Sequence, residues 1–230
     1  MELNALFTSL VAGTIFLIGF LISGVLSDYK ESEKLPSELS ASMKTLFDDA
    51  YTIFKGKNSD TAYRFIEFQK SFTDSLMDWF YKKERTRFLL NKISMMNDFI
   101  IDLDKEGIQA NYIIKLKNEQ NILIKMILRI DTVRDTEFIG SAYAIVEAMG
   151  FLIGLGLIII KIEPFYASLF ITLLVTFLIS YMFLLIKDLD NPFDYTANGE
   201  RGTEISLKPI RDLIAEFNAF KKNDLERKNC

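Results

Sequence analysis

Three long windows of the chain contain almost no charge, whereas charged residues are frequent everywhere else. The windows cover residues 5–27, 138–160 and 166–186, and the one charged residue inside them is Glu147. A helix needs about 20 apolar residues to cross the hydrocarbon core of a bilayer. The pattern therefore predicts an N-terminal transmembrane helix within residues 1–27 and a transmembrane helical hairpin within residues 138–187.

The first window is interpreted as a retained anchor and not as a cleaved signal peptide. The charged residue in front of it is Glu2, whereas a signal peptide begins with basic residues. Its apolar run is also longer than the hydrophobic part of a signal peptide.

The distribution of Lys and Arg predicts which ends of the spans face the cytoplasm. Basic residues gather in residues 28–137 and after residue 186, and Lys161 alone lies in the short connection at residues 161–164. Basic residues beside spans favour the cytoplasmic side. We therefore expect a multi-pass protein of the inner cell membrane with its N-terminus outside, its C-terminus in the cytoplasm, and a tight external hairpin at residues 161–164.

Residues 28–137 have the pattern of a helical cytoplasmic domain. A first helix is predicted to open at Pro36 and end near Gly56, and a second to run unbroken from Ser59 or Asp60 to Gly107. A third follows and reaches the second span, with a weak point at residues 131–135. The apolar stripe of the second helix has steps of mainly three and four residues; it consists of Phe65, Phe68, Phe72, Leu76, Trp79, Leu90, Ile93, Met96, Ile100 and Leu103.

The expected fold class is therefore all-α: a membrane protein with three transmembrane helices and a long helical-hairpin cytoplasmic domain. The long stripe needs a partner surface, either in the same hairpin or in a neighbouring subunit. Residues 188–230 form a cytoplasmic tail with an amphipathic helix, which either packs on the domain or lies on the membrane. Its apolar positions are Leu207, Ile210, Leu213, Ile214, Phe217 and Phe220.

Composition argues against several classes of function. The net charge of −4 is unlike that of a nucleic-acid binder, which carries a basic face. The chain has no His, and its one cysteine is Cys230, so neither a disulfide framework nor a cysteine metal cluster can form within one copy. Phosphate-loop, nucleophile-elbow and zinc signatures are absent from the sequence. We therefore predict no enzyme activity, no metal site and no cofactor.

Glu147 is the first candidate functional residue. A carboxylate in the middle of a span is costly in lipid and normally faces water or the interior of a helix bundle. Tyr143, Gly150 and Gly154 share its helical face, and the two glycines allow a close helix approach. Glu147 is either part of a pore, ion site or proton relay, or a protonated residue that bonds a neighbouring helix.

A stripe of hydroxyl groups in the third span gives further candidates. Its members follow one another at four-residue steps and so stay roughly on one helix face; they are Ser168, Thr172, Thr176 and Ser180. Such a stripe either lines a wet path or bonds backbone carbonyls and neighbouring helices.

Two charged clusters lie in the predicted cytoplasmic domain. Lys82, Lys83, Arg85 and Arg87 are expected on the long second helix, where they meet anionic lipid or a regulator, or form a solvated face partly paired with Glu84. An acidic group follows, which lacks the spacing of a calcium-binding loop; it consists of Asp98, Asp102, Asp104 and Glu106.

The segment after the third span contains an acidic turn, a later Gly202, and a Ser206–Pro209 opening of a terminal helix. The turn consists of Asp188, Leu189, Asp190, Asn191, Pro192 and Phe193. Over roughly the last third of the chain, these features resemble the end of the bestrophin-like family of bacterial and plant membrane proteins. The chain departs from the family pattern in having one span before its cytoplasmic helices, and an insertion at residues 195–201.

True bestrophins are pentameric chloride channels with a cytoplasmic helical region, so the resemblance implies an oligomeric pore. On the residues alone, Pro192 prevents the helix from continuing as it leaves the lipid. The leading hypothesis is a homo-oligomeric ion channel whose cytoplasmic helices assemble or gate it, with the lipid bilayer and permeant ions as its partners. The alternative is a membrane-anchored sensor, scaffold or defence-type interaction protein that transports nothing.

Overall fold

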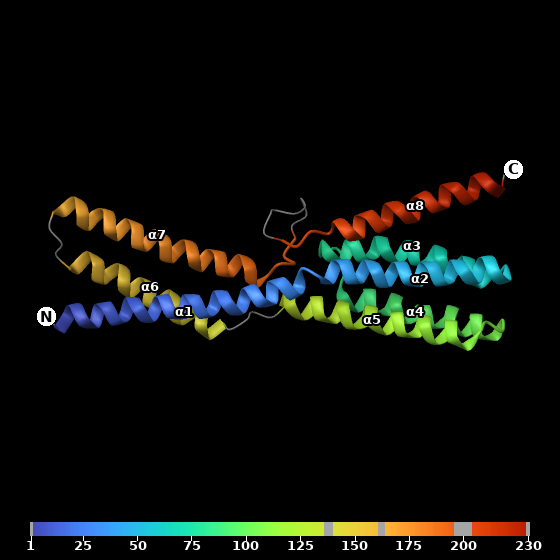
Figure 1. Cartoon of the computed structure of the whole chain (residues 1–230), viewed down its shortest axis with the longest axis horizontal. Helices are drawn as coiled ribbons and strands as arrows, with labels where there is room; N and C mark the ends of the chain where they lie inside the picture. The colour runs from blue at the N-terminus through green and yellow to red at the C-terminus, as the bar shows by residue number, and fades with distance from the viewer. Residues whose placement is uncertain (1, 136–139, 161–163, 196–203, 229–230) are drawn as a thin grey trace. The chain divides into compact units, whose positions relative to one another are not determined.

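The computed structural model describes residues 2–135, 140–160, 164–195 and 204–228, and every regular element in these ranges is an α-helix. The chain divides into two compact units (Figure 1). Unit 1 comprises residues 1–31 and 136–192, and unit 2 comprises residues 32–135 and 193–230. The predicted fold class, an all-α protein with three long apolar helices, is confirmed.

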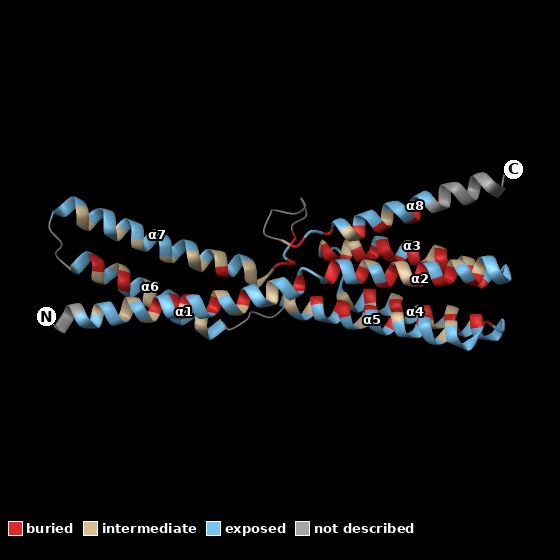
Figure 2. Cartoon of the chain, viewed as in Figure 1, coloured by how far each residue is buried: buried red, intermediate tan, exposed pale blue. Residues whose placement is uncertain are grey.

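Unit 1 contains the apolar helices α1 (Glu2–Ser32), α6 (Gly140–Ile159) and α7 (Phe165–Asp190). The stretches that contain these helices are long and apolar enough to cross a membrane. The three helices meet in a small core, in which Leu21 and Val25 of α1 are fully buried. Most of the remaining surface of unit 1 is apolar and exposed in a single copy (Figure 2), as expected of helices whose surroundings are lipid or other protein.

Unit 2 is an antiparallel four-helix bundle with a fifth helix on its surface. The bundle helices are α2 (Leu35–Lys57), α3 (Asp60–Phe80), α4 (Thr86–Lys105) and α5 (Ala110–Asp135). Each packs on two of the others, in the order α2, α3, α4, α5 and back to α2. The predicted apolar stripe fills the bundle interior, where Phe65, Phe72 and Trp79 are completely buried. The partner of that stripe is therefore the rest of the same domain.

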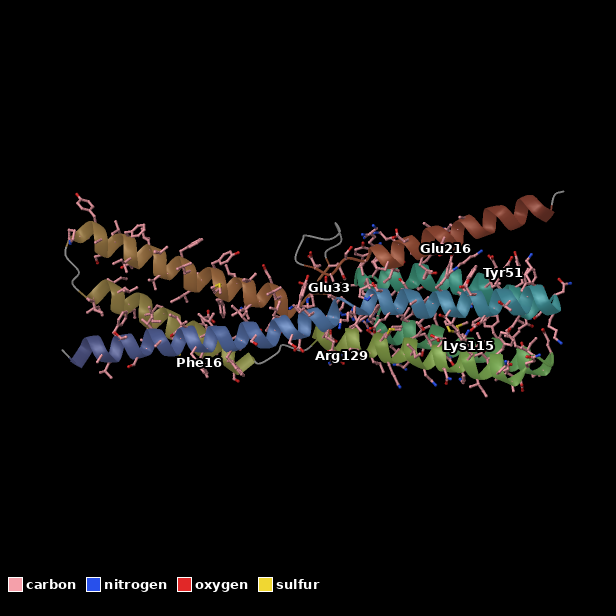
Figure 3. All side chains as sticks on the ribbon, viewed as in Figure 1. Phe16, Glu33, Tyr51, Lys115, Arg129 and Glu216 are labelled. Atoms are coloured by element: carbon pink, nitrogen blue, oxygen red, sulfur yellow. The ribbon has the colours of Figure 1, made fainter. Side chains whose placement is uncertain are left out.

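Polar contacts also join the bundle helices. Lys115 lies on α5, where Figure 3 labels it. Its ammonium is 2.7 Å from the Asp49 carboxylate of α2, and Ser42 of α2 donates a hydrogen bond of 2.6 Å to Glu119 of α5. Asp49 is almost fully buried, and its charge is compensated by Lys115. Such a pair orients α2 against α5, since a buried charge without its partner is costly.

The predicted long second helix is wrong: the chain turns back between residues 81 and 85, so that α3 and α4 are separate helices. Lys82 adopts a left-handed conformation with φ of 59°. The N–H of Lys83 bonds the carbonyl of Asp78 at 2.8 Å, and the N–H of Lys82 bonds that of Trp79 at 3.0 Å. This pair of bonds is the Schellman motif, which satisfies the last carbonyls of a helix.

The other helix ends agree with the predicted signals. Pro36 lies in the first turn of α2, and the Ser59 hydroxyl caps α3 by accepting a bond from the Ala62 N–H at 3.0 Å. Gly107, with φ of 74°, ends α4 in the same motif as Lys82. A glycine marks that end in the sequence, whereas Lys82 gives no such signal.

The amphipathic tail helix packs on the bundle. Helix α8 (Lys208–Lys228) contacts α2 and α3. Phe217 is 1% exposed and stacks on Phe47 with ring centroids 4.3 Å apart. Beside this stack, Glu216 of α8 lies 2.5 Å from Lys44 of α2. Of the two alternatives for the tail, packing on the domain is confirmed.

The segment after α7 is attached to the end of α3. The Phe193 and Tyr195 side chains are buried, and their rings lie 6.2 and 5.9 Å from the ring of Phe80. The Tyr195 hydroxyl donates a 2.6 Å hydrogen bond to the carbonyl of Ile205. These aromatic contacts join the chain that leaves the third span to the bundle.

Several sequence predictions concern residues outside the described ranges. They are the external hairpin, of which residues 161–163 are not described, the insertion beyond Tyr195, and the terminal Cys230. The side of the membrane on which unit 2 lies also stays a prediction.

We expect Phe217→Ala to release α8 from the bundle, because Phe→Ala changes at buried sites cost about 3–5 kcal/mol. Hydrogen exchange of the full-length protein in detergent measures the effect as faster exchange across residues 208–219. The matched control is Asn218→Ala, which alters an exposed position of the same turn. Equal exchange in both variants contradicts the assigned packing.

Glu106 provides a pH-dependent contact between α3 and the end of α4. Its carboxylate accepts hydrogen bonds of 2.5 Å from both Ser59 and Thr61, and these bonds lower its pKa below the usual value for a glutamate. Because the folded pKa is the lower one, the contact stabilises the fold above the unfolded pKa of about 4.3 and is lost as pH falls through the folded pKa.

In Glu106→Gln we therefore expect a smaller loss of thermal stability between pH 5 and pH 3 than in the wild-type protein. Thr61→Val should raise the pKa of Glu106 toward its ordinary value, measured from carboxyl chemical shifts. The control is Asp104→Asn, which alters an exposed carboxylate in the last turn of α4. An unchanged acid-induced loss in Glu106→Gln contradicts the prediction.

Candidate functional site

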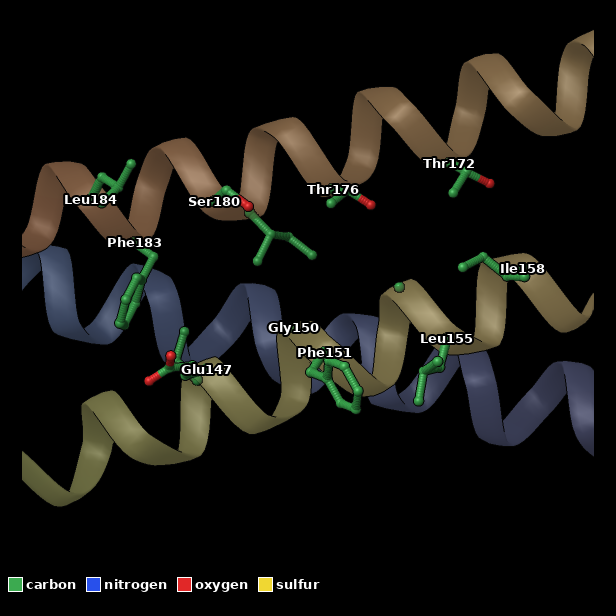
Figure 4. Close-up of a pocket in the computed structure, with 13 residues that line it drawn as sticks. Glu147, Gly150, Phe151, Leu155, Ile158, Thr172, Thr176, Ser180, Phe183 and Leu184 are labelled. Atoms are coloured by element: carbon green, nitrogen blue, oxygen red, sulfur yellow. The ribbon is translucent and has the colours of Figure 1, made fainter.

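A groove of about 490 Å³ runs between α6 and α7 within unit 1. It collects most of the polar residues predicted in the two spans (Figure 4). The predicted residues that line it are Glu147, Gly150, Gly154, Thr172, Thr176 and Ser180. Apolar side chains complete the walls, among them Phe151, Leu155 and Phe183.

The α6 wall combines Glu147 with two glycines. From Glu147 to Ile158 the wall extends roughly 16 Å at 1.5 Å per residue, about half of the hydrocarbon core. A Cβ atom on Gly150 would lie 3.0 Å from Cγ2 of Ile179, whereas one on Gly154 would meet nothing within 4 Å. Gly150 thus permits close approach of α7, and Gly154 widens the groove.

The α7 wall carries the hydroxyl groups. Thr172, Thr176 and Ser180 face the groove at successive turns (Figure 4). The Thr172 hydroxyl donates a 2.8 Å hydrogen bond to the backbone carbonyl of Ser168. Ser168 itself is not among the residues that line the groove. Thr172 therefore both bonds a backbone carbonyl of its own helix and lines the groove.

Tyr143 lies elsewhere, although it is one helical turn from Glu147. Its side chain is 6% exposed in the core shared by α1, α6 and α7. Its ring meets that of Phe183 edge-on at 6.3 Å. Tyr143 therefore connects the helices, and the groove begins at the next turn of α6.

Glu147, Thr176 and Ser180 are exposed in a single copy of the chain. Their neighbours on the groove rim are apolar and exposed as well; Phe151 and Ile158 are 68% and 73% exposed. Within α7, all of which is described, Ile186 is the one fully buried side chain. The polar groove therefore opens on a surface that the copy itself leaves uncovered.

One close contact in unit 1 was missed by the sequence analysis. A Cβ atom on Gly156 would lie 2.6 Å from Cε2 of Phe7, so the Phe7 ring of α1 packs directly on this glycine of α6. Gly156 is two residues beyond the predicted Gly150–Gly154 pair. The signal was present, since the second span has four glycines, but spacing alone does not say which glycine meets which helix.

The turn after the third span is formed as predicted. Helix α7 ends at Asp190, two residues before Pro192, because the residue that precedes a proline is restricted to extended conformations. Asp188 is exposed, and Asn191 caps the helix with φ of −122°. Phe193 packs against Phe80 and so holds the end of the turn, a role that the sequence did not indicate.

Metal coordination is not indicated by the described side chains. No group of three or more His, Cys, Asp or Glu residues within the described ranges could hold a metal ion. The acidic cluster in α4 is used in other ways: Asp102 pairs with Lys105 at 3.0 Å, and Glu106 binds Ser59 and Thr61.

The chain was compared with known families, curated proteins and solved structures. No family model and no curated protein matches the sequence. The fold, in contrast, matches solved structures of bacterial bestrophin homologues. One, a point variant of a bestrophin homologue from Klebsiella pneumoniae, has a TM-score of 0.75 and 15% identity, over 93% of this chain and 86% of that chain.

A second structure of a bestrophin homologue from Klebsiella pneumoniae has a TM-score of 0.75 and 16% identity, over 94% of this chain and 87% of that one. A further variant from the same organism has a TM-score of 0.76, again with 16% identity. Identity this low shows likeness of the fold alone. The resemblance to the bestrophin-like family, inferred from the turn after the third span, is confirmed as a likeness of fold.

We expect Gly156→Ala to lower the thermal stability of the protein by about 1–3 kcal/mol, because overpacking forces neighbouring side chains to shift. Gly154→Ala is the matched control: it makes the same change in the same helix, where the added methyl group meets open space. Thermal denaturation in detergent compares the two variants. Equal stability contradicts the packing of the Phe7 ring on Gly156.

Proposed function

Because the chain has the fold of the bacterial bestrophin homologues, we propose that it is a subunit of a homo-oligomeric ion channel. The observation that carries the proposal is the groove between α6 and α7, in which a carboxylate and three hydroxyl groups from two apolar helices lie together. Fold likeness by itself does not establish an activity. The groove adds support for a channel from this chain's own residues.

The exposure of the groove favours an oligomer. An ionisable side chain inside a membrane faces a bundle interior or a water-filled cavity, because lipid cannot solvate it. In one copy Glu147 faces neither, since it is exposed on the surface of unit 1. A neighbouring copy supplies the missing cover, and several copies around one axis enclose a path that three helices alone cannot.

The groove residues have the chemistry for an ion path. Thr172, Thr176 and Ser180 offer oxygen atoms that replace part of the hydration shell of an ion, and Glu147 places a carboxylate at one end of the row. A ring of carboxylates attracts cations when ionised. The likeness to bestrophins points to anions instead, so the charge of the permeant ion is left to the measurement.

The same proposal includes the orientation inferred from the basic residues. With the N-terminus outside, unit 2 lies in the cytoplasm, where its bundle assembles the subunits or gates the path. The position of Lys and Arg beside the spans supports this arrangement.

We expect discrete single-channel currents from the purified protein in planar bilayers. Glu147→Gln should change the unitary conductance by roughly twofold or more and shift the reversal potential toward anion permeation, because it removes the charge of an acidic ring. Thr176→Val, which removes a groove hydroxyl at almost constant volume, should alter conductance in the same assay.

The matched control is Glu38→Gln, which removes an exposed carboxylate from unit 2 and should leave the currents unchanged. Size-exclusion chromatography confirms that each variant is folded and assembled. Currents that are the same in wild type and Glu147→Gln overturn the assigned path. The absence of current from folded oligomers, at varied voltage, calcium and pH, favours the membrane-anchored sensor or scaffold.

A further inference from the structure

The turn between α3 and α4 is a basic surface that neither the groove nor the proposed channel explains. It consists of Tyr81, Lys82, Lys83, Glu84 and Arg85, followed by Arg87 and Phe88 in the first turn of α4. The sequence pattern assigned its basic residues to the side of a long helix. The bundle places them together on an exposed turn.

Bundle topology determines which end of unit 2 carries this turn. Helix α2 begins, α3 ends, α4 begins and α5 ends at the same end, because successive helices are antiparallel and joined by short connections (Figure 1). The chain passes between unit 2 and the apolar helices at three places, after residues 31, 135 and 192. Every one of these connections leaves from the end that carries the turn.

A direct contact confines the turn to the neighbourhood of a span. Lys82 forms an ion pair with Asp194, and Asp194 is four residues beyond Asp190, the last residue of α7. Four residues reach at most ~14 Å. The headgroup region of a bilayer begins where the apolar residues of a transmembrane helix end. The length of the chain between Asp190 and Asp194 therefore keeps the turn within reach of the headgroups.

Side-chain contacts hold the turn in shape. The Trp79 indole N–H donates a 2.9 Å hydrogen bond to the Thr86 hydroxyl, which also accepts one of 3.1 Å from Arg134. The Arg134 guanidinium lies 4.9 Å from the centre of the Trp79 ring and 2.5 Å from Asp131. The basic residues are thus displayed on a preorganised turn.

The charges on the turn divide into paired and unpaired groups. Lys82 is paired with Asp194, and Lys83 lies 3.2 Å from Asp78. Arg85 and Arg87 are exposed and form no ion pair or hydrogen bond with side chains of the described residues. Glu84 is half-buried, so the outward charge is dominated by the two arginines.

We propose that Arg85 and Arg87, assisted by Lys83, bind the phosphate groups of anionic phospholipids in the leaflet that adjoins unit 2. Guanidinium groups bond phosphate oxygens in pairs, and basic residues close to a membrane are attracted to anionic lipid. Phe88, which is 47% exposed beside Arg87, supplies an apolar ring of the kind that membrane-surface helices bury at the boundary between headgroups and acyl chains.

The lipid surface is favoured over an acidic protein by position. Three chain connections to the apolar helices leave that end of the bundle. They keep the turn within reach of lipid headgroups and restrict the access of a partner protein. The inference does not depend on channel activity, because a membrane-anchored scaffold would present the same turn.

Trp79 provides the test, since it is the one tryptophan of the chain and bonds the turn directly. The full-length protein is reconstituted in vesicles that contain phosphatidylglycerol or phosphatidylcholine with a nitroxide near the headgroup. Quenching of Trp79 fluorescence then reports the relative association of each lipid with the turn. We expect phosphatidylglycerol to quench more strongly, by about fivefold in relative association for each arginine.

In the double variant Arg85→Gln with Arg87→Gln the preference for phosphatidylglycerol should disappear, and in Arg85→Lys with Arg87→Lys it should be largely retained. High salt should weaken it in the wild-type protein, because screening shortens the reach of exposed charges. The matched control is Lys55→Gln with Lys57→Gln at the opposite end of α2, which should leave the preference unchanged.

Three outcomes overturn the proposal. Equal quenching by the two lipids in the wild-type protein excludes selectivity for anionic headgroups. Absence of quenching by both lipids excludes proximity to the membrane. A preference that persists in the double glutamine variant assigns it to other residues. None of these readouts requires an ionic current, so failure here and failure of the proposed channel are distinguishable.

Discussion

The architecture of this chain follows from the need of every apolar helix face to be covered, which is met differently in its two units. In unit 2 the faces cover one another, so that Phe65, Phe72 and Trp79 are completely buried within one copy. In unit 1 a small core holds α1, α6 and α7 together, and α7 leaves all but Ile186 at least partly exposed. Such helices require lipid or further protein around them.

Polar side chains on the membrane helices of unit 1 do not suit a lipid environment, and they are therefore the best guide to function. Glu147 lies on α6, and the hydroxyls of Thr172, Thr176 and Ser180 lie on α7, yet all four side chains line one groove. A groove of this kind is costly against lipid. Its cost is removed when a second copy or water covers it, and the proposals of an oligomer and of an ion path both rest on this requirement.

The end of the bundle near residue 82 connects several parts of the chain. The aromatic rings that follow α7 pack on Phe80, while Arg134, in the last turn of α5, contacts Trp79 and Thr86. Segments on both sides of the α6 and α7 region are thus attached to one turn. Arg85 and Arg87 are exposed on and beside that turn, so one element combines attachment with the proposed lipid contact.

Sequence alone determined what depends on local composition: three apolar helices, the end of α4 at Gly107 and the stop before Pro192. It proposed Glu147 and the hydroxyl stripe as candidates, but the tertiary structure decided which of them line one groove. The sequence did not predict the reversal at Lys82, because a left-handed lysine leaves no mark in the apolar pattern, which continues in phase from α3 to α4. Tertiary structure also separated Tyr143 from Glu147, since residues one turn apart share a helical face, and the neighbouring helices decide which of them is buried.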